Sequence, residues 1–277
     1  MLIHLPWASI HAARADHPEK KGNFLLSSSQ QIGPLFGFGQ NIVDKHDTQV
    51  FANLQQFGGI QKNHTSVLPS ILYGIRNNLS IFITFPNVPP INDGFQLQRN
   101  LNSIVPQLEY AFINKETKTS TTQMTGVFNV SIPTGSSKKR IINRSGSTSI
   151  CLGSTLSYMT QWWSGWVQAG AVLTASGNHN TKLGNRFLYQ AGLEKYFATR
   201  DGWIFAGIIE LFGIHEQINN QDALISGKNT FFIGPSLWAS SHKIIMQLGL
   251  ATPIKKHTLK KQFKRPHFLS VNLAYKF

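Results

Sequence analysis

Five polar or ionisable side chains lie within segments whose apolar residues alternate with a period of two. In each segment the apolar residues take one face and the polar residue takes the other. A face of this kind could bind or conduct a polar solute, or it could form a polar network that fills a narrow interior. These candidate residues are Glu109, Arg186, Gln190, Glu194 and Glu210.

Signatures of catalysis and of cofactor binding are absent from the sequence. It contains no G-x-x-x-x-G-K-[ST], G-x-G-x-x-G, C-x-x-C, H-E-x-x-H or G-x-S-x-G motif. Gly37-Phe38-Gly39 has no helix signal after it, so we do not expect it to bind phosphate. The single cysteine, Cys151, excludes an intramolecular disulfide. We therefore expect no cofactor, no metal site and no catalytic residues.

An outer-membrane lipase is the enzymatic alternative that needs consideration, because known lipases of this kind are twelve-stranded barrels with a chain of similar length. It would need a histidine and a serine two residues apart on one face of a strand. Ser176 and His179 do not have this spacing. A histidine in a surface loop is the interpretation we favour.

The alternating pattern continues along the chain from residue 48. It is clearest in 267–277, where Leu269, Val271 and Leu273 share one face and Ser270 the other. A period of two over eleven residues predicts a strand. We count twelve such segments of about ten residues, the length that a tilted strand needs to cross a bilayer. The predicted fold class is all-β: a transmembrane antiparallel up-and-down barrel of about twelve strands, whose last strand ends in Phe277.

The connections between these segments alternate in length. The short ones are 74–78, 160–162, 198–202 and 240–242, and the long ones are 86–102, 134–147, 177–184, 213–229 and 254–266. Tight periplasmic turns and longer outer loops are typical of outer-membrane barrels, so we expect both termini in the periplasm. Two connections fit less well, because 58–64 is short for an outer loop and 113–121 is long for a periplasmic turn.

Aromatic residues gather near the predicted strand ends. We expect them to form girdles at the two membrane interfaces. Those next to the short turns include Tyr73, Tyr110, Tyr158, Trp162, Trp163, Tyr196, Trp203, Trp238 and Tyr275, and those at the opposite ends are Phe57, Phe85, Phe187, Phe212, Phe231 and Phe268.

Composition and charge further narrow the class of protein. Only 14% of the residues are charged, and no apolar run reaches the 18 residues of a transmembrane helix. The net charge is +14, and 10 of the 26 lysines and arginines lie in two long loops. We expect these loops to contact lipopolysaccharide or simply to be solvated, and we expect no nucleic-acid binding. The residues are Lys138, Lys139, Arg140, Arg144, Lys255, Lys256, Lys260, Lys261, Lys264 and Arg265.

The region before the first predicted strand has two parts. Residues 1–15 end in Ala13-Arg14-Ala15, which fits a signal-peptidase site, although no basic residue precedes the short apolar stretch. We interpret 1–15 as a signal peptide, whose true start could lie upstream, and 16–47 as a periplasmic or lumenal segment. The barrel then covers 48–277.

Several short motifs resemble one known family of outer-membrane barrels, which is named for the meta-pathway of phenol degradation. The stretch 68–79, with Tyr73-Gly74-Ile75, is similar to a strand–turn–strand of that family. Further similarities are Ile132-Pro133-Thr134-Gly135, Ile209-Glu210-Leu211-Phe212-Gly213 and the hairpin 233–254. The resemblance covers most of residues 50–277. It implies transport of small or hydrophobic compounds.

The sequence thus predicts an outer-membrane channel or transporter for small solutes, hydrophobic or aromatic ones among them. Outer-membrane lipid and lipopolysaccharide would surround it, and Phe277 would be recognised by the barrel assembly machinery. A second hypothesis is a structural or surface-interaction barrel whose basic loops bind lipopolysaccharide or a partner. The lumen could be open, or blocked by side chains or by residues 16–47.

Overall fold

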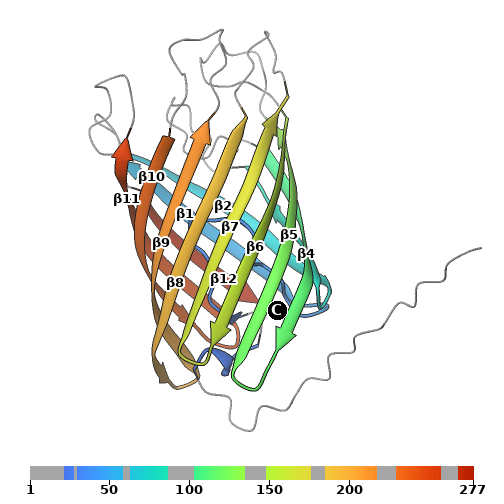
Figure 1. Cartoon of the computed structure of the whole chain (residues 1–277), viewed down its shortest axis with the longest axis vertical. Coiled ribbons are helices and arrows are strands. Elements are labelled where there is room, and N and C mark those ends of the chain that lie inside the picture. The colour runs from blue at the N-terminus through green and yellow to red at the C-terminus, as the bar shows by residue number, and fades with distance from the viewer. Residues whose placement is uncertain are drawn as a thin grey trace, which may run out of the picture.

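The computed structural model describes residues 22–27, 30–58, 63–86, 103–134, 148–175, 185–216, 229–256 and 268–277. Twelve antiparallel strands form a closed barrel in which each strand pairs with its neighbours in the chain and β1 pairs with β12 (Figure 1). The predicted fold class is therefore confirmed. The strands are β1 (Thr48–Gly58), β2 (Asn63–Arg76), β3 (Leu79–Thr84), β4 (Ser103–Glu116), β5 (Ser120–Pro133), β6 (Ser149–Thr160), β7 (Trp163–Thr174), β8 (Arg186–Arg200), β9 (Trp203–Glu216), β10 (Asn229–Ser240), β11 (Ile244–Lys256) and β12 (Phe268–Lys276).

Short turns join the strands at one end of the barrel, which we call the turn end. One of the two-residue turns is Asp201-Gly202, where both residues have positive φ, as a type I′ hairpin requires. The connection at 113–121, which looked too long, is short because β4 continues to Glu116 and β5 starts at Ser120. Connections at the other end run through 59–62, 87–102, 135–147, 176–184, 217–228 and 257–267, which lie outside the described residues.

Two of the predicted long loops begin too early, and the predicted short turns 74–78 and 198–202 likewise include the last residues of β2 and β8. Residues 213–216 continue β9 and residues 254–256 continue β11. The dyad pattern weakens there, because Gly213 and Pro253 interrupt the apolar alternation, but the backbone ladder extends past it. Lys255 and Lys256 consequently lie at the end of a strand rather than in a loop.

The two faces of the barrel wall differ in polarity. In β6 the outward side chains of Leu152 and Leu156 are 54% and 44% exposed, whereas the inward side chain of Thr155 is 2% exposed. This outward apolar surface suits lipid, and the inward face is largely polar. No helix in the described part of the chain is long and apolar enough to cross a membrane.

The predicted aromatic girdles are only partly correct. Trp162, Trp163 and Phe187 lie on the outer surface, but Trp238, Phe212 and Phe268 point inward and are at most 8% exposed. Position near a strand end therefore does not decide where a ring faces. The strand's alternation decides it, and these three rings share the face of polar neighbours such as Ser236 and Ser270.

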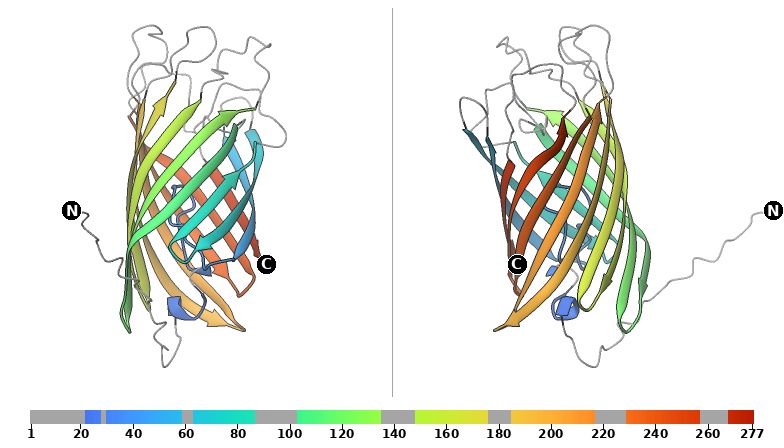
Figure 2. Two further views of the ribbon diagram at one scale, coloured as in Figure 1. Left: turned by 90° about the vertical axis from the view of Figure 1, so that its right-hand side faces the viewer. Right: turned by 60° about the vertical axis from the view of Figure 1, so that its left-hand side comes forward.

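Residues 22–27 and 30–47, which we call the plug, lie inside the barrel. The short 3-10 helix η1 (Gly22–Phe24) sits at the turn end, and the following chain rises within the lumen before it returns to β1 (Figure 2). The Asn23 N–H donates to the Gln161 carbonyl in the β6–β7 turn at 3.0 Å. The His46 N–H donates to the Gly74 carbonyl of β2 at 2.8 Å. The plug is thus attached to the wall where it enters and where it leaves.

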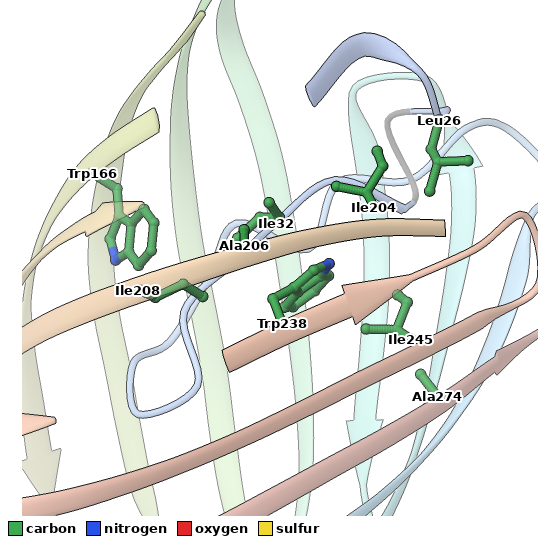
Figure 3. Packing of buried hydrophobic residues seen from close by; sticks show 9 residues of the cluster. All are labelled: Leu26, Ile32, Trp166, Ile204, Ala206, Ile208, Trp238, Ile245 and Ala274. Atoms are coloured by element: carbon green, nitrogen blue, oxygen red, sulfur yellow. The ribbon is translucent and has the colours of Figure 1, made fainter. Parts of the chain in front are cut away.

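Two apolar clusters hold the plug against the wall. Leu26 and Ile32 pack with Trp238, Ile204 and other buried residues near the turn end (Figure 3). Phe36 packs deeper in the lumen, against a second group whose members are Leu68, Phe212, Phe232, Ala251 and Phe268. Its ring centroid is 5.3 Å from those of Phe212 and Phe268. Burial of these plug side chains favours the filled lumen.

Inward-facing glycines of the wall make room for the aromatic rings of the plug. Phe38 lies so close to β6 and β7 that a Cβ at Gly153 or Gly170 would be 2.5 Å or 2.8 Å from its ring. Likewise, a Cβ at Gly234 of β10 would lie 2.6 Å from the ring of Phe36. A side chain at these positions would occupy the space that the plug uses.

We expect Gly234→Val to loosen the plug without displacing the backbone of the wall, because the atoms nearest to a Cβ at this position all belong to side chains. The new side chain would collide with the Phe36 ring, and overpacking of this kind costs about 1–3 kcal/mol. The measurement is the rate at which a protease cleaves residues 30–47 of the purified protein in detergent. Gly126→Val is the matched control, because a Cβ at the outward-facing Gly126 meets nothing nearer than 3.7 Å. Equal cleavage rates for both variants would contradict the packing described above.

Candidate functional site

Glu109 of β4 binds the plug where the plug backbone turns. Its carboxylate accepts the Asn41 N–H at 2.8 Å and the Asn41 side-chain amide at 2.6 Å. Gly39 and Gln40 have φ values of 78° and 69°, and this left-handed turn directs the Asn41 N–H at the carboxylate. The Gln107 amide donates to the same group at 2.6 Å. Glu109 is fully buried.

Glu210 of β9 forms the second contact of this type. One carboxylate oxygen accepts the Leu35 N–H at 3.0 Å, and the other accepts the Phe36 N–H at 3.2 Å. Gln190 of β8 donates its side-chain amide to Glu210 as well. Two consecutive backbone N–H groups of the plug are thereby satisfied by one side chain of the wall.

A pair of facing glutamines lies between these two contacts. Gln168 of β7 and Gln190 of β8 are opposite each other in the sheet. The Gln168 side-chain oxygen accepts the Phe38 N–H at 3.1 Å. A Cβ at Gly37 would lie 2.7 Å from Cδ of Gln190, so only a glycine allows the plug backbone to pass so close. This explains Gly37-Phe38-Gly39 as a structural motif rather than a phosphate loop.

Glu194 of β8 binds the start of the plug. Its carboxylate accepts the Asn23 side-chain amide at 3.1 Å and the Ser164 hydroxyl at 2.8 Å. Asn23 also donates to the Thr160 carbonyl at 3.1 Å. Glu194 is fully buried, and it fixes η1 at the turn end.

Lys276 of β12 connects the two ends of the plug. Its ammonium group lies 2.5 Å from the Asp47 carboxylate and 3.4 Å from the Ser27 hydroxyl. Asp47 directly precedes β1, and Ser27 follows η1. Because these side chains are partly exposed at the turn end, the ion pair is screened more than the deeper contacts are.

The three carboxylates come from different parts of the wall. β8 and β9 are adjacent, whereas four strands separate β9 from β4 on one side and six on the other. Glu210 and Glu109 therefore hold the plug from nearly opposite walls. Such contacts position a peptide segment. They do not form a nucleophile–base pair, and no three His, Cys, Asp or Glu side chains of the described residues converge to hold a metal ion.

The structure places the predicted lumen residues as follows. Glu109, Gln190, Glu194 and Glu210 face the interior and are at most 5% exposed, and all four take part in plug contacts. Arg186 faces the same interior near the other end, opposite Val172 and Glu216, and is less buried. A role in solute binding stays a prediction for all five.

Most of the predicted surface residues lie outside the described ranges. These are Lys138, Lys139, Arg140, Arg144, Lys260, Lys261, Lys264 and Arg265, and the same holds for Ser176 and His179. Residues 1–15, the expected signal peptide, also lie outside the described ranges.

Sequence reasoning missed the plug side of the site and two amides of the wall. Asn23 and Asn41 of the plug, and Gln107 and Gln168 of the wall, carry no motif, so nothing marked them individually. A usable signal was the pattern 33–39, which has three glycines and one proline just before the first strand. The wall glycines on polar faces of strands, such as Gly153 and Gly170, were a second signal that something packs there.

No protein-family model matches the sequence, and a search of curated proteins also gives no match. Among solved structures, the COG4313 outer membrane channel from Pseudomonas putida F1 superimposes with a TM-score of 0.57 and 12% identity, covering 89% of this chain and 100% of that one.

Two further structures are more distant. The NanC porin has a TM-score of 0.49 and 10% identity over 82% of this chain and 100% of its own. The CymD monoaromatic hydrocarbon channel has a TM-score of 0.39 and 8% identity over 89% and 94%. The Pseudomonas likeness shows that this chain has the fold of an outer-membrane channel barrel.

We expect Glu210→Gln to release the middle of the plug. The amide would present its NH₂ group or a single acceptor to two N–H donors, and an unsatisfied buried group costs about 1–3 kcal/mol. Protease cleavage of residues 30–47 in detergent should accelerate roughly tenfold. The heat-modifiable gel mobility of the barrel should persist, because no ladder hydrogen bond changes.

Glu116→Gln serves as the control, since Glu116 lies exposed beside the turn end. If both variants are cleaved at the rate of the parent, Glu210 does not hold the plug. If Glu210→Gln abolishes heat-modifiable mobility, Glu210 is required for the barrel itself.

Proposed function

We propose that this protein is an outer-membrane channel for small solutes, whose lumen the plug closes. The observation that carries the proposal is the polarity of the inner wall. A barrel built only as a structural element can fill its lumen with apolar wall side chains. Here the buried inward residues are mostly amides, hydroxyls and carboxylates, among them Gln49, Gln55, Ser66, Ser70, Ser80, Gln107, Thr125, Ser131, Thr155, Gln168, Ser236 and Ser270.

Such a wall is compatible with water once the plug has moved. Its polar groups could exchange plug contacts for hydration, so the lumen would form a water-filled path like that of porins. Each neutral hydrogen bond to the plug contributes only about 0.5–1.5 kcal/mol net. The plug is covalently joined to the barrel at β1 alone, so it can leave the lumen toward the turn end without breaking the wall.

We further propose a location in the bacterial outer membrane and membership of the barrel family named for the meta-pathway of phenol degradation. The apolar outer surface supports the location. The motifs quoted from the sequence support the family, and one of them, 209–213, contains Glu210. The solutes would be small, with hydrophobic or aromatic ones among them. A transport role without chemistry also accounts for the absence of any catalytic motif.

The basic loops suggest a contact with lipopolysaccharide. Ten cationic residues without any acidic neighbour in 134–147 and 254–266 would meet the phosphates of the outer leaflet if the turn end faces the periplasm. The C-terminal Phe277, which is 74% exposed, is available for the barrel assembly machinery.

Conductance in planar bilayers tests the channel. We expect the parent protein to conduct weakly, and Glu109→Gln/Glu210→Gln to show a severalfold larger mean conductance, because both walls then lose their contacts with the plug. Glu116→Gln should behave as the parent does. A double variant whose plug is readily cleaved but whose conductance is unchanged would show that the lumen is not a solute pathway.

Labelling with an impermeant thiol reagent tests the orientation. In a Cys151→Ser background, cysteines at Lys139 and Lys260 should react on intact cells. Cysteines at Asn77 and Thr199, near the turn end, should react only after the outer membrane is opened. The reverse pattern would place the turn end outside and would remove the basis for the lipopolysaccharide contact.

A further inference from the structure

The deepest part of the plug carries two aromatic rings, one on each side of a glycine. Phe36 and Phe38 are half-buried, and Gly37 between them is exposed. The wall residues beside Phe36 lie away from the turn end, because Phe268 is the first residue of β12 and Phe232 lies three residues after the start of β10. Part of the Phe36 ring is therefore accessible from the half of the lumen that opens away from the turn end.

The Phe36 ring is the outer member of a stack of three. Its centroid is 5.3 Å from that of Phe212, at an interplanar angle of 22°. The Phe212 ring in turn lies 4.8 Å from that of Phe232, at 10°. The Phe268 ring borders Phe36 on another side, at 5.3 Å and tilted by 55°. Three of these four rings belong to the wall, and the fourth belongs to a segment that is joined to the barrel at β1 alone.

Small wall residues lie beneath the Phe36 ring. A Cβ at Gly234 would be 2.6 Å from Cε2 of Phe36, and a Cβ at Gly249 would be 3.2 Å from its Cζ. Ala251 belongs to the same apolar cluster and is fully buried. The wall alone thus forms a recess that is one ring deep. We call it the ring recess, and its residues are Phe212, Phe232, Phe268, Gly234, Gly249 and Ala251.

The chemistry of the ring recess suits an uncharged aromatic ring. Its side chains are aromatic or small, and stacked or tilted contacts between rings are favourable beyond the area that they bury. These contacts depend on the ring and not on the peptide, so a free ring of the same size can form them. The Glu210 carboxylate, which accepts the Phe36 N–H at 3.2 Å, lies beside the recess and disfavours an anion there.

We propose that the ring recess binds one aromatic ring of an uncharged solute, and that Phe36 occupies it as a competitor built into the chain. A solute that enters the recess displaces the Phe36 ring and removes one of the two apolar clusters that hold the plug. The N–H groups of Leu35 and Phe36 then lose their fixed position at Glu210, so the plug loosens. The proposal rests on the proposed function in one respect, since a loosened plug opens a solute path only if the lumen conducts.

Phenol, cyclohexanol and benzoate test the ring recess on the parent protein in detergent at neutral pH. Phenol has the ring and no charge, cyclohexanol has a saturated ring of similar size, and benzoate has the ring with a negative charge. The measurement is protease cleavage of residues 30–47, normalised to cleavage of a soluble peptide by the same protease. We expect phenol to accelerate cleavage severalfold, and cyclohexanol at the same concentration to have an effect about threefold smaller, because it forms no ring–ring contacts.

Benzoate should leave the cleavage rate unchanged. Phenol without any effect, or cyclohexanol and phenol with equal effects, would overturn the proposal.

Phe36→Ala and Phe38→Ala distinguish displacement of Phe36 from a general loosening by the solute. Both substitutions remove a ring of the plug, so both should raise the basal rate of cleavage. In Phe36→Ala the ring recess is empty, so phenol fills it and should no longer accelerate cleavage. The Phe38 ring packs on Gly153 and Gly170 instead, so in Phe38→Ala phenol should still accelerate cleavage as it does in the parent.

Equal acceleration of the two variants by phenol would overturn the proposal. Heat-modifiable gel mobility checks that both variants fold, and the comparison of the three probes needs no variant.

The affinity for phenol gives a direct measurement of the competition. In the parent only the fraction of molecules whose recess is vacant can bind, so ligand-observed NMR should show phenol binding to Phe36→Ala at least about fivefold more tightly than to the parent. Phe38→Ala should bind phenol as the parent does. Equal affinities of Phe36→Ala and Phe38→Ala would contradict the site.

The ring recess and the channel can fail separately. If phenol releases the plug but plug-loosened variants conduct no better than the parent, the channel is refuted and the recess remains. If conductance rises when the plug is loosened by substitution but phenol neither binds nor releases the plug, the channel remains and the recess is refuted.

Discussion

A peptide segment inside a barrel has no strand to pair with, and this constraint shapes the whole interior. The N–H groups of the plug are buried, and an unpaired buried N–H is costly. The wall therefore has to supply acceptors on its inward face, at heights that match the path of the plug. Ser80 does so for the Val43 N–H at 3.1 Å, and Gln168 does so for Phe38. The plug thus accounts for part of the polarity of the inner wall, while inward residues such as Ser66 and Ser70 donate to other groups of the wall.

Polar and apolar contacts have different roles along the plug. Phe36 and Phe38 insert into spaces left by wall glycines, and a side chain at those glycines would collide with the rings. The hydrogen bonds fix the backbone between them. Packing contributes most of the favourable free energy through burial, whereas the hydrogen bonds mainly prevent the cost of unsatisfied groups. A molecule that forms hydrogen bonds with the wall would thus compete with the hydrogen bonds of the plug before it affects the apolar packing.

The barrel could be predicted from sequence because each strand carries its own period-two pattern, as in 267–277, and because short and long connections alternate. The inward position of Glu210 followed from the same pattern. A lumenal position of residues 16–47 was one of two predicted alternatives. The path of the plug could not be predicted, since its residues have no period and its contacts with Glu109 or Gln168 join residues far apart in the chain. The alternation also shows where position near a strand end misleads: Trp238 and Phe268 lie near strand ends but face inward.

The type of acceptor matches the number of donors at each point of the plug. Where two donors of the plug point at one place on the wall, the wall supplies a carboxylate, which accepts through both oxygens and donates nothing. These donors are the Leu35 and Phe36 N–H groups at Glu210, and the N–H and side-chain amide of Asn41 at Glu109. Where a single N–H points at the wall, a neutral acceptor suffices, as Gln168 and Ser80 show. A glutamine at a paired position would set its own NH₂ against a donor, so the carboxylate is justified there despite the cost of burying it. The donors of the plug therefore account for Glu109 and Glu210, whereas Glu194 accepts the Asn23 side-chain amide and the Ser164 hydroxyl.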